Sequence, residues 1–542
     1  MRTHVHQFRF SSLPFIAIAT FLLVSCEKQR DNAGLGLKRD PNATVRQPGA
    51  QNADQASIAR DTFSAPAEEY GEIVENDFLD AAANRFSTFS IDVDAASYSN
   101  VRRFLTERTL PPRDAVRIEE MVNYFPYDYP EPTGDDPFSI TAESAVCPWN
   151  PAHRLVHVGL QGRHIDMSQL PPSNLTFLID VSGSMEAPNK LPLLKDAFHL
   201  LVNQLRPEDR VAIVVYAGAA GVVLEPTSGS EKGTILKAID DLQSGGSTAG
   251  GEGITLAYDL ARRNFKSGGN NRVILATDGD FNVGVSDDDA LVRLIKKERS
   301  SGVFLSVIGV GEGNLQDHKM EQLADNGNGN YSYIDGVEEA KKVFATEMGA
   351  TLFTIAKDVK VQVEFNPARV KSYHLIGYEN RLLRTKDFSN DRKDAGELGA
   401  GHAVTAIYEV VPSDGTPRQK GMPASSAVAA APGDPVVSPT ADMLVKLRYK
   451  APNGTASRLI SRQVEITSTP IESASNNLKF SAAVAGWGQM LRNSKYKGNL
   501  SFDTVLNLAR SGVGADPQGY RTEFLALVET SRQLSPVEVA SR

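Results

Sequence analysis

Three short polar segments combine hydroxyl and carboxylate side chains in a pattern suited to binding a divalent cation. They are Asp180-Val181-Ser182-Gly183-Ser184, Gly245-Gly246-Ser247-Thr248 and Thr277-Asp278-Gly279. In the first segment, alternate side chains can point the same way from a loop. Their donors are oxygen atoms without soft ligands, which suits Mg²⁺ or another divalent cation such as Mn²⁺ or Ca²⁺. Two carboxylates would offset the charge of the ion.

The elements around these segments are expected to bring them to one place. The apolar runs 175–179 and 273–276 are typical of buried strands, and each ends directly before one of the polar segments. Strands and amphipathic helices alternate over 172–350, which predicts a parallel sheet covered on both faces. In such sheets ligands bind at the carboxyl ends of the strands. We therefore predict that the three segments converge on one edge.

These residues resemble the metal-ion-dependent adhesion site of von Willebrand factor A domains. The resemblance covers about 172–350 and implies that two serines and a threonine bind the ion directly, while two aspartates act mainly through water. The residues that it assigns to these roles are Ser182, Ser184, Thr248, Asp180 and Asp278. A domain of this kind normally binds other molecules rather than catalysing a reaction.

Thr248 is preferred to Ser247 because of the residues downstream of it. In the family the threonine lies five residues before a small residue and six before an aliphatic one, as Thr248 does before Gly253 and Ile254. The alternative is that all these residues serve turns and helix caps without a metal, where Ser, Thr and Asp are common.

Two further acidic groups could take part in ion binding. Asp92-Val93-Asp94 could bind a cation, but the interpretation we favour is that Asp94 caps the helix after it. Asp280 and Asp287 to Asp289 crowd the predicted metal edge and could repel acidic ligands or recruit a second ion. The interpretation we favour is that these residues lie in a solvated loop and at the start of a helix.

The expected fold class is α/β: a doubly wound, Rossmann-like von Willebrand factor A domain with a parallel-rich central sheet. It is inserted between flanking segments that form a β-rich α+β domain, because strands predicted on both sides need paired edges. The predicted divisions are a lipoprotein signal peptide at 1–25, a flexible tether at 26–83, an N-terminal flank at 84–165, the A domain at 166–350, and a C-terminal β-rich and helical region at 351–535 with a disordered loop at 412–440.

Charge and cysteine content exclude several classes of protein. The chain has 542 residues with 57 Lys and Arg against 66 Asp and Glu, a net charge of −9. A mildly acidic chain lacks the basic field that binds nucleic acid. Its 2 cysteines exclude a disulfide scaffold and a Cys-rich metal site.

The N-terminus predicts a lipid anchor. Residues 13–24 are almost wholly apolar, too short a run to span a bilayer, and they end in Leu23-Val24-Ser25-Cys26. This resembles the bacterial lipobox, which implies cleavage before Cys26 and acylation of its thiol and new amine. By resemblance to lipoprotein sorting in Gram-negative bacteria, Glu27 in place of Asp favours the outer membrane. The alternative is an ordinary secretory leader. If Cys26 is lipidated, Cys147 has no partner within the chain, and it is expected to be a small buried hydrophobe.

The function predicted from these observations is a membrane-anchored, bacterial cell-envelope lipoprotein that binds a protein partner through the metal. An acidic side chain of the partner would complete the coordination of the ion. The alternatives are a metal-dependent hydrolase or phosphatase, and a structural envelope protein in which the ion only holds loops together. We expect no enzyme, since no general base or nucleophile accompanies the site and Ser182 lacks the G-x-S-x-G elbow. The flanks more loosely resemble those of bacterial lipoproteins that carry this domain.

Overall fold

The alternating segment forms one six-stranded sheet with helices on both faces. A computed structural model describes residues 68–247, 250–279, 288–347, 352–413 and 433–535. Strand order is β10-β9-β8-β5-β6-β7, and every pair is parallel except β6–β7. The strands are β5 (Ser173–Asp180), β6 (Arg210–Tyr216), β7 (Ala220–Ser228), β8 (Asn270–Thr277), β9 (Phe304–Val310) and β10 (Tyr331–Ile334).

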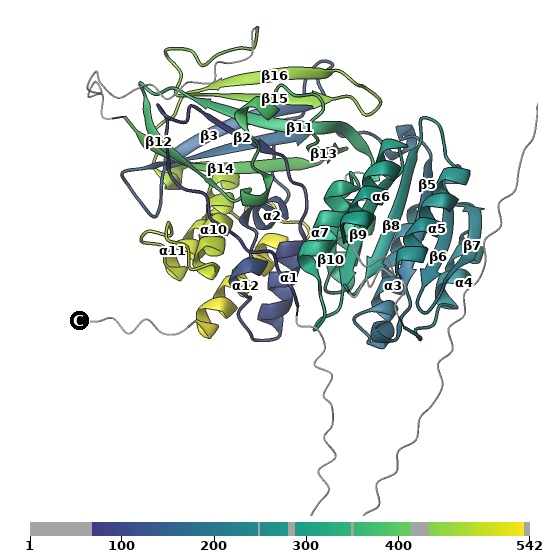
Figure 1. The fold of residues 1–542 in the computed structure, drawn as a ribbon. Coiled ribbons are helices and arrows are strands. Elements are labelled where there is room, and N and C mark those ends of the chain that lie inside the picture. The colour runs from purple at the N-terminus through teal and green to yellow at the C-terminus, as the bar shows by residue number, and fades with distance from the viewer. Residues whose placement is uncertain (1–67, 248–249, 280–287, 348–351, 414–432, 536–542) are drawn as a thin grey trace, which may run out of the picture. The chain divides into compact units, whose positions relative to one another are not determined.

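Alternate side chains of the buried strands pack into two apolar cores, one on each face of this sheet. Phe177 of β5 belongs to the core under α3, α4 and α8, and Leu178 to the core under α5, α6 and α7. The helices are α3 (Leu191–Gln204), α4 (Lys232–Asp240), α5 (Gly250–Arg263), α6 (Asp288–Ser300), α7 (Asp317–Asn326) and α8 (Val337–Lys341). Figure 1 shows these helices along the sheet. The predicted doubly wound α/β fold is confirmed.

The flanks build two antiparallel sheets together. One has the order β1-β12-β14-β4-β3 and the other β13-β11-β15-β16, with β2 paired to β11. Val158 of β4 pairs with Ala406 of β14, and Phe89 of β2 pairs with Val361 of β11, so both sheets join strands from the two sides of the α/β insertion. The strands are β1 (Leu79–Asp80), β2 (Phe86–Ser90), β3 (Phe138–Val146), β4 (Arg154–Gly162), β11 (Thr354–Phe365), β12 (Val370–Ile376), β13 (Gly396–Gly399), β14 (Ala403–Pro412), β15 (Met443–Lys450) and β16 (Ser457–Val464).

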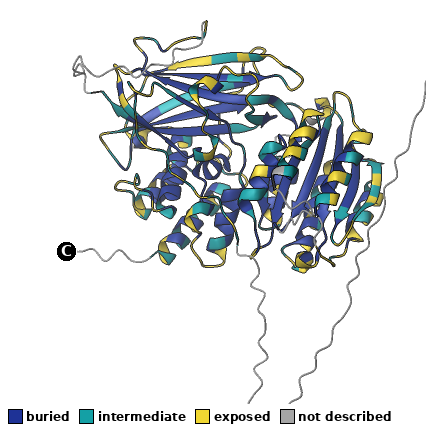
Figure 2. Ribbon diagram, in the orientation of Figure 1, coloured by how far each residue is buried: buried dark blue, intermediate teal, exposed yellow. Residues whose placement is uncertain are grey.

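Helices of the flanks surround an aromatic core. Phe125, Phe480, Trp487 and Phe524 are all buried and belong to one cluster. Helix α10 is buried along most of its length, as its dark blue colour in Figure 2 shows. The helices are α1 (Ala96–Thr106), α2 (Ile118–Asn123), α10 (Asn476–Leu491), α11 (Phe502–Gly512) and α12 (Tyr520–Leu534). The predicted insertion into a β-rich α+β domain is thus confirmed.

Two segments predicted to be unstructured are partly packed. Residues 68–83 belong to the predicted tether, but Glu69 bonds to the α/β domain and Leu79 pairs with Tyr373 of β12. In the predicted disordered loop, Val437 is buried and Asp434 pairs with Arg448 at 2.9 Å. Composition could not reveal these contacts, because the partners are distant in sequence. Residues 414–432, the leader and Cys26 lie outside the described residues. In the described part of the chain, no helix is long and apolar enough to cross a membrane.

Candidate metal centre

Two of the predicted metal-binding loops lie side by side because their strands are neighbours. Ile179 of β5 pairs with Ala276 of β8 in parallel register. Asp180 is the last residue of β5, and Asp278 follows the last residue of β8, so both carboxylates stand at the same edge. Both residues are fully buried. Sequence reasoning from strand ends therefore placed these two side chains together.

The first loop is held by its own hydrogen bonds and by the second loop. The Ser182 amide donates to Asp180 Oδ1 at 2.9 Å, and the hydroxyls of Ser182 and Ser184 lie 3.1 Å apart. Gly183 N–H donates to the carbonyl of Gly246 at 3.1 Å. Ser182 is buried whereas Ser184 is exposed, so the hydroxyl pair runs from the interior to the surface.

Several predicted site residues lie outside the described residues. These are Thr248, Asp280 and Asp287, and the side chains of Asp288 and Asp289, although α6 begins at Asp288. Ser247 and the glycines before it are described, and they place the second loop against the first. The structure thus brings Asp180, Ser182, Ser184 and Asp278 together.

Lys190 is a member of this edge that the sequence analysis missed. It precedes α3, is 7% exposed, and donates from Nζ to Asp278 Oδ2 at 2.9 Å and to Asn314 Oδ1 at 3.2 Å. Burial by itself would raise the pKa of Asp278, but the Lys190 ammonium and further hydrogen bonds lower it. No spacing in the sequence links Lys190 to Asp278, so only the tertiary fold reveals the pair.

Asp180 has a different environment from Asp278. Tyr216 and Thr277 each donate a hydroxyl hydrogen bond to its Oδ2 at 3.1 Å. Burial, opposed by bonds from Ser182, raises the pKa of Asp180 to about 6, and the charge of Asp278 acts in the same direction. The Asp180 carboxylate is thus bonded by hydroxyl and amide groups while it lies near a second buried carboxylate, so a cation bound at this edge would stabilise its charged form.

The donor chemistry fits a hard divalent ion. Among the described residues, no three His, Cys, Asp or Glu side chains come together as a metal site. The candidate set instead combines two carboxylates with serine hydroxyls, and these oxygen donors are the kind that Mg²⁺ accepts.

A second polar cluster joins the flanks to the α/β domain and corrects the prediction for Asp94. The N-cap of α1 is Ala95, without a side-chain capping bond. Asp94 instead accepts a hydrogen bond from the Tyr331 amide of β10 at 2.8 Å and pairs with Arg381 at 3.4 Å. Asp92 also pairs with Arg381, at 3.0 Å. The cation that these aspartates bind is therefore a guanidinium of the C-terminal flank.

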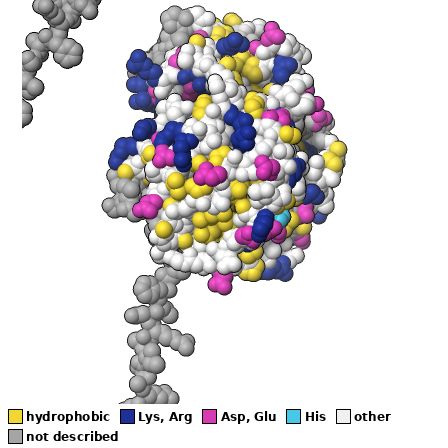
Figure 3. Space-filling view, turned by 90° about the vertical axis from the view of Figure 1, so that its right-hand side faces the viewer, with side chains coloured by type: hydrophobic (Ala, Val, Ile, Leu, Met, Phe, Trp, Pro, Cys, Tyr) yellow, Lys and Arg dark blue, Asp and Glu magenta, His cyan; other side chains and the backbone are white. Residues whose placement is uncertain are grey.

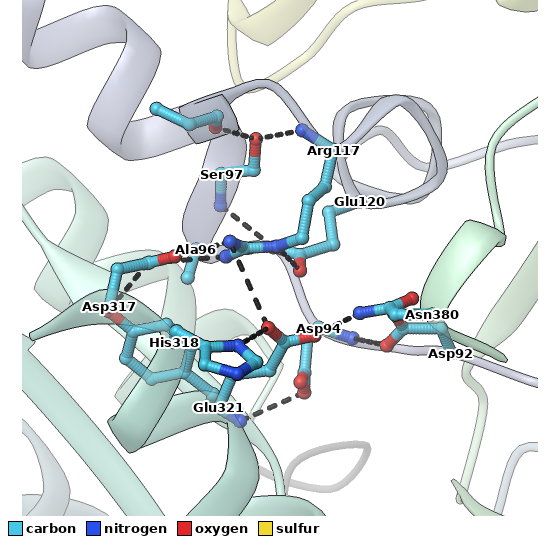
Figure 4. Close-up of polar contacts among 12 residues, drawn as sticks. Asp92, Asp94, Ala96, Ser97, Arg117, Glu120, Asp317, His318, Glu321 and Asn380 are labelled. Carbon is cyan, nitrogen blue, oxygen red and sulfur yellow. Dashed lines mark hydrogen bonds and ion pairs between the residues drawn. The ribbon is translucent and has the colours of Figure 1, made fainter. Parts of the chain in front are cut away.

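Arg117 lies at the centre of the same cluster (Figure 4). It is buried and binds Glu120 of its own flank and Asp317 at the start of α7, with one Asp317 contact at 3.2 Å. Glu321 of α7 lies nearby and pairs with Arg381 at 3.2 Å. The cluster thus attaches α7 to both flanks through buried charges.

Three segments of the chain match known protein families. Residues 174–346 match the von Willebrand factor type A domain family, residues 64–157 the family described as von Willebrand factor, and residues 350–534 the family described as uncharacterized protein YfbK, C-terminal. The uncharacterized protein YfbK of Escherichia coli K12 is 45% identical over 471 residues, which is 85% of this chain and 80% of that protein.

A more distant relative and a solved structure have lower identity to this chain. The uncharacterized protein sll0103 of Synechocystis is 28% identical over 193 residues, covering 36% of this chain and 45% of that protein. Among solved structures, a von Willebrand factor type A protein from Catenulispora acidiphila has 16% identity and a TM-score of 0.41, covering 74% of this chain and 91% of that one. The descriptions of these relatives name no enzymatic activity.

Proposed function

Because this chain belongs to the YfbK family and contains a von Willebrand factor type A domain, we propose that it is a lipid-anchored envelope protein that binds partner proteins through a divalent cation. The observation that carries the proposal is the convergence of Asp180, Ser182, Ser184 and Asp278 at one sheet edge. With Thr248, these residues would hold the ion, which would supply a positive site for a carboxylate.

The exposure of the edge supports binding rather than burial of the ion. Ser184 and Ser247 are exposed while both aspartates are buried. The buried side of the site would therefore hold the ion, and its exposed side would stay open to a partner. A partner carboxylate could then take a free coordination position. Without the ion the partner would face two buried carboxylates, so the interaction should depend on the metal.

An apolar surface adjoins this edge and supports a protein partner. Figure 3 views the side of the molecule formed by β7 and α4, where hydrophobic side chains gather in the middle of the face. Val223 of β7 is 41% exposed. The turn before β7 approaches the metal edge, since a Cβ on Gly218 would lie 3.6 Å from Ser247 Oγ. Apolar patches beside polar groups are typical of protein-binding surfaces.

The test is ion binding by the purified protein, measured by isothermal titration calorimetry with Mg²⁺ and Mn²⁺. We expect binding by the wild type and much weaker binding by Ser182→Ala and Thr248→Ala, with unchanged circular dichroism. Thr255→Ala is the matched control, because its exposed hydroxyl bonds only within α5, to the Gly251 carbonyl.

Partner capture from membranes with Mg²⁺ or with chelator tests the second half of the proposal. A partner retained equally by the wild type and Thr248→Ala, with or without chelator, would show that the ion does not mediate recognition. Hydrolysis of phosphoesters by the wild type that is lost in Thr248→Ala would favour a metal-dependent enzyme instead.

A further inference from the structure

The loop between β9 and α7, residues 311–316, forms one wall of the metal edge. Asn314 accepts a hydrogen bond from the Lys190 ammonium that also binds Asp278. Gly279, directly after Asp278, has φ +105°, and a Cβ there would lie 2.5 Å from the Gln316 nitrogen. The backbone beside Asp278 is therefore in close contact with this loop, so the loop position determines where Asp278 can lie.

The same loop is held from its other side by residues 68–71, which we call the strap. Glu69 and Gln316 form a parallel β-bridge. Glu69 N–H donates to the Leu315 carbonyl at 2.9 Å, and Asp317 N–H donates to the Glu69 carbonyl at 3.1 Å. Glu68 Oε1 accepts a further bond from the Gly313 amide at 2.8 Å. Two bonds thus join the strap to this loop, and the third joins it to Asp317, the first residue of α7.

The strap is itself held against α1 of the N-terminal flank. Arg103 donates to Glu68 Oε2 at 2.8 Å and is only 8% exposed. Tyr70 donates to the same Oε2 at 2.7 Å and accepts a bond from Asn100 at 2.9 Å. Glu68 therefore uses one carboxylate oxygen for the loop and the other for α1, so its side chain connects the flank to the metal edge.

We propose that the strap keeps the loop 311–316 in the position that orients Asp278, and that displacement of the strap weakens ion binding. This inference rests on the proposed function, because it assigns a regulator to the same metal edge. The strap lies within the predicted tether to the lipid anchor, at the start of its described part. A pull on that segment would reach the strap before the rest of the described fold, which makes the strap the point where anchoring and ion binding meet.

Two variants separate the geometry of the strap from the charge of Glu68. Glu68→Ala removes the acceptor of Gly313 and the partner of Arg103. In the second, Glu69→Cys with Gln316→Cys, the bridged pair can be oxidised to a disulfide that locks the strap, because bridge partners lie close enough for one. Glu72→Ala is the matched control, since Glu72 is exposed and close by in sequence.

Ion affinity and amide hydrogen exchange are measured on the full chain. We expect Glu68→Ala to bind Mg²⁺ about tenfold more weakly, which is the low end of the loss caused by removing outer partners of metal sites. The Gly313 and Asp317 amides should exchange faster in this variant, whereas Glu72→Ala should match the wild type. The disulfide, added to Glu68→Ala, should restore affinity when oxidised but not when reduced.

The contrary results are distinct from one another. Absence of ion binding by the wild type would overturn both this proposal and the proposed function. Equal affinities of wild type and Glu68→Ala would overturn the strap alone. A weakened Glu68→Ala that the oxidised disulfide fails to restore would also overturn it, because the effect would then come from charge rather than from the position of the loop.

Discussion

Lys190 forms a buried ion pair whose energetic weight can be measured without any metal. Its ammonium binds Asp278 at 2.9 Å, and the two side chains are 9% and 0% exposed. Removal of one member of a buried pair typically costs about 3–5 kcal/mol, because the other charge is left uncompensated. We expect Lys190→Met to lower the free energy of unfolding by an amount in this range, measured by urea denaturation in chelator.

The double variant Lys190→Met/Asp278→Asn is the control for this prediction. It removes both charges, so it should recover much of the loss seen in Lys190→Met. Additive losses from the two single substitutions would show that the pair contributes no interaction energy.

His157 should make the protein less stable in mild acid. It is buried between Tyr129 and Ser481, which lie 2.6 and 2.9 Å from its ring nitrogens, and burial lowers its pKa to about 3. Below the ordinary pKa of about 6.5, the unfolded chain binds a proton that the folded chain does not, so stability falls as pH drops. Between pH 7 and pH 5 this histidine should cost about 2 kcal/mol.

The measurement is the loss of unfolding free energy over this interval in the wild type and in His157→Gln. The comparison between variants is needed because other buried groups also titrate. His374, with a pKa lowered to about 4, acts in the same direction, whereas Glu120, with a pKa raised to about 8, acts oppositely. Equal losses in both proteins would contradict the prediction.

At the scale of elements, α7 depends on buried charges to pack against the flanks. Arg117 binds Asp317 at the first residue of α7, and Arg381 pairs with Glu321 one turn later. Arg117→Met would leave the buried carboxylate of Asp317 without this cation. We expect it to destabilise the protein by about 3–5 kcal/mol in thermal or urea unfolding.

Lys237→Met is the control for Arg117→Met. Lys237 also pairs with an aspartate, Asp241 at 2.7 Å, but both side chains are exposed, by 74% and 63%. Exposed pairs contribute about 0–1 kcal/mol, so this variant should be close to wild type. Similar losses in the two variants would mean that burial of the cluster does not matter.

For the whole molecule, the prediction concerns membrane anchoring through Cys26. We predict that Cys26→Ala yields an unprocessed or soluble product, since the lipid needs the thiol. Cys147→Ala is the control, because Cys147 is fully buried, as expected from its apolar neighbours, and should leave membrane fractionation unchanged. Normal cleavage and membrane association of Cys26→Ala would refute the lipoprotein prediction.

The sequence by itself determined the features that depend on local pattern. The apolar run 175–179 specifies a buried strand, and a polar segment follows it at the strand's end. The expected parallel sheet therefore placed Asp180 and Asp278 at the same edge, as the structure has them. Helices in the C-terminal region were also expected from the sequence. The half-buried strands of the flanks could also be predicted from the sequence, because side chains alternate between the two faces of a sheet.

Only the tertiary structure decided which distant segments meet. Pairing of β2 with β11, the Lys190–Asp278 contact, the attachment of Asp94 to Tyr331 and the strap on loop 311–316 each join residues far apart in the chain. Periodicity reports the conformation of a segment but not its partner. A charged side chain before a helix has the same local pattern whether it caps that helix or binds another domain. Which of the two it does depends on the groups that folding brings near it.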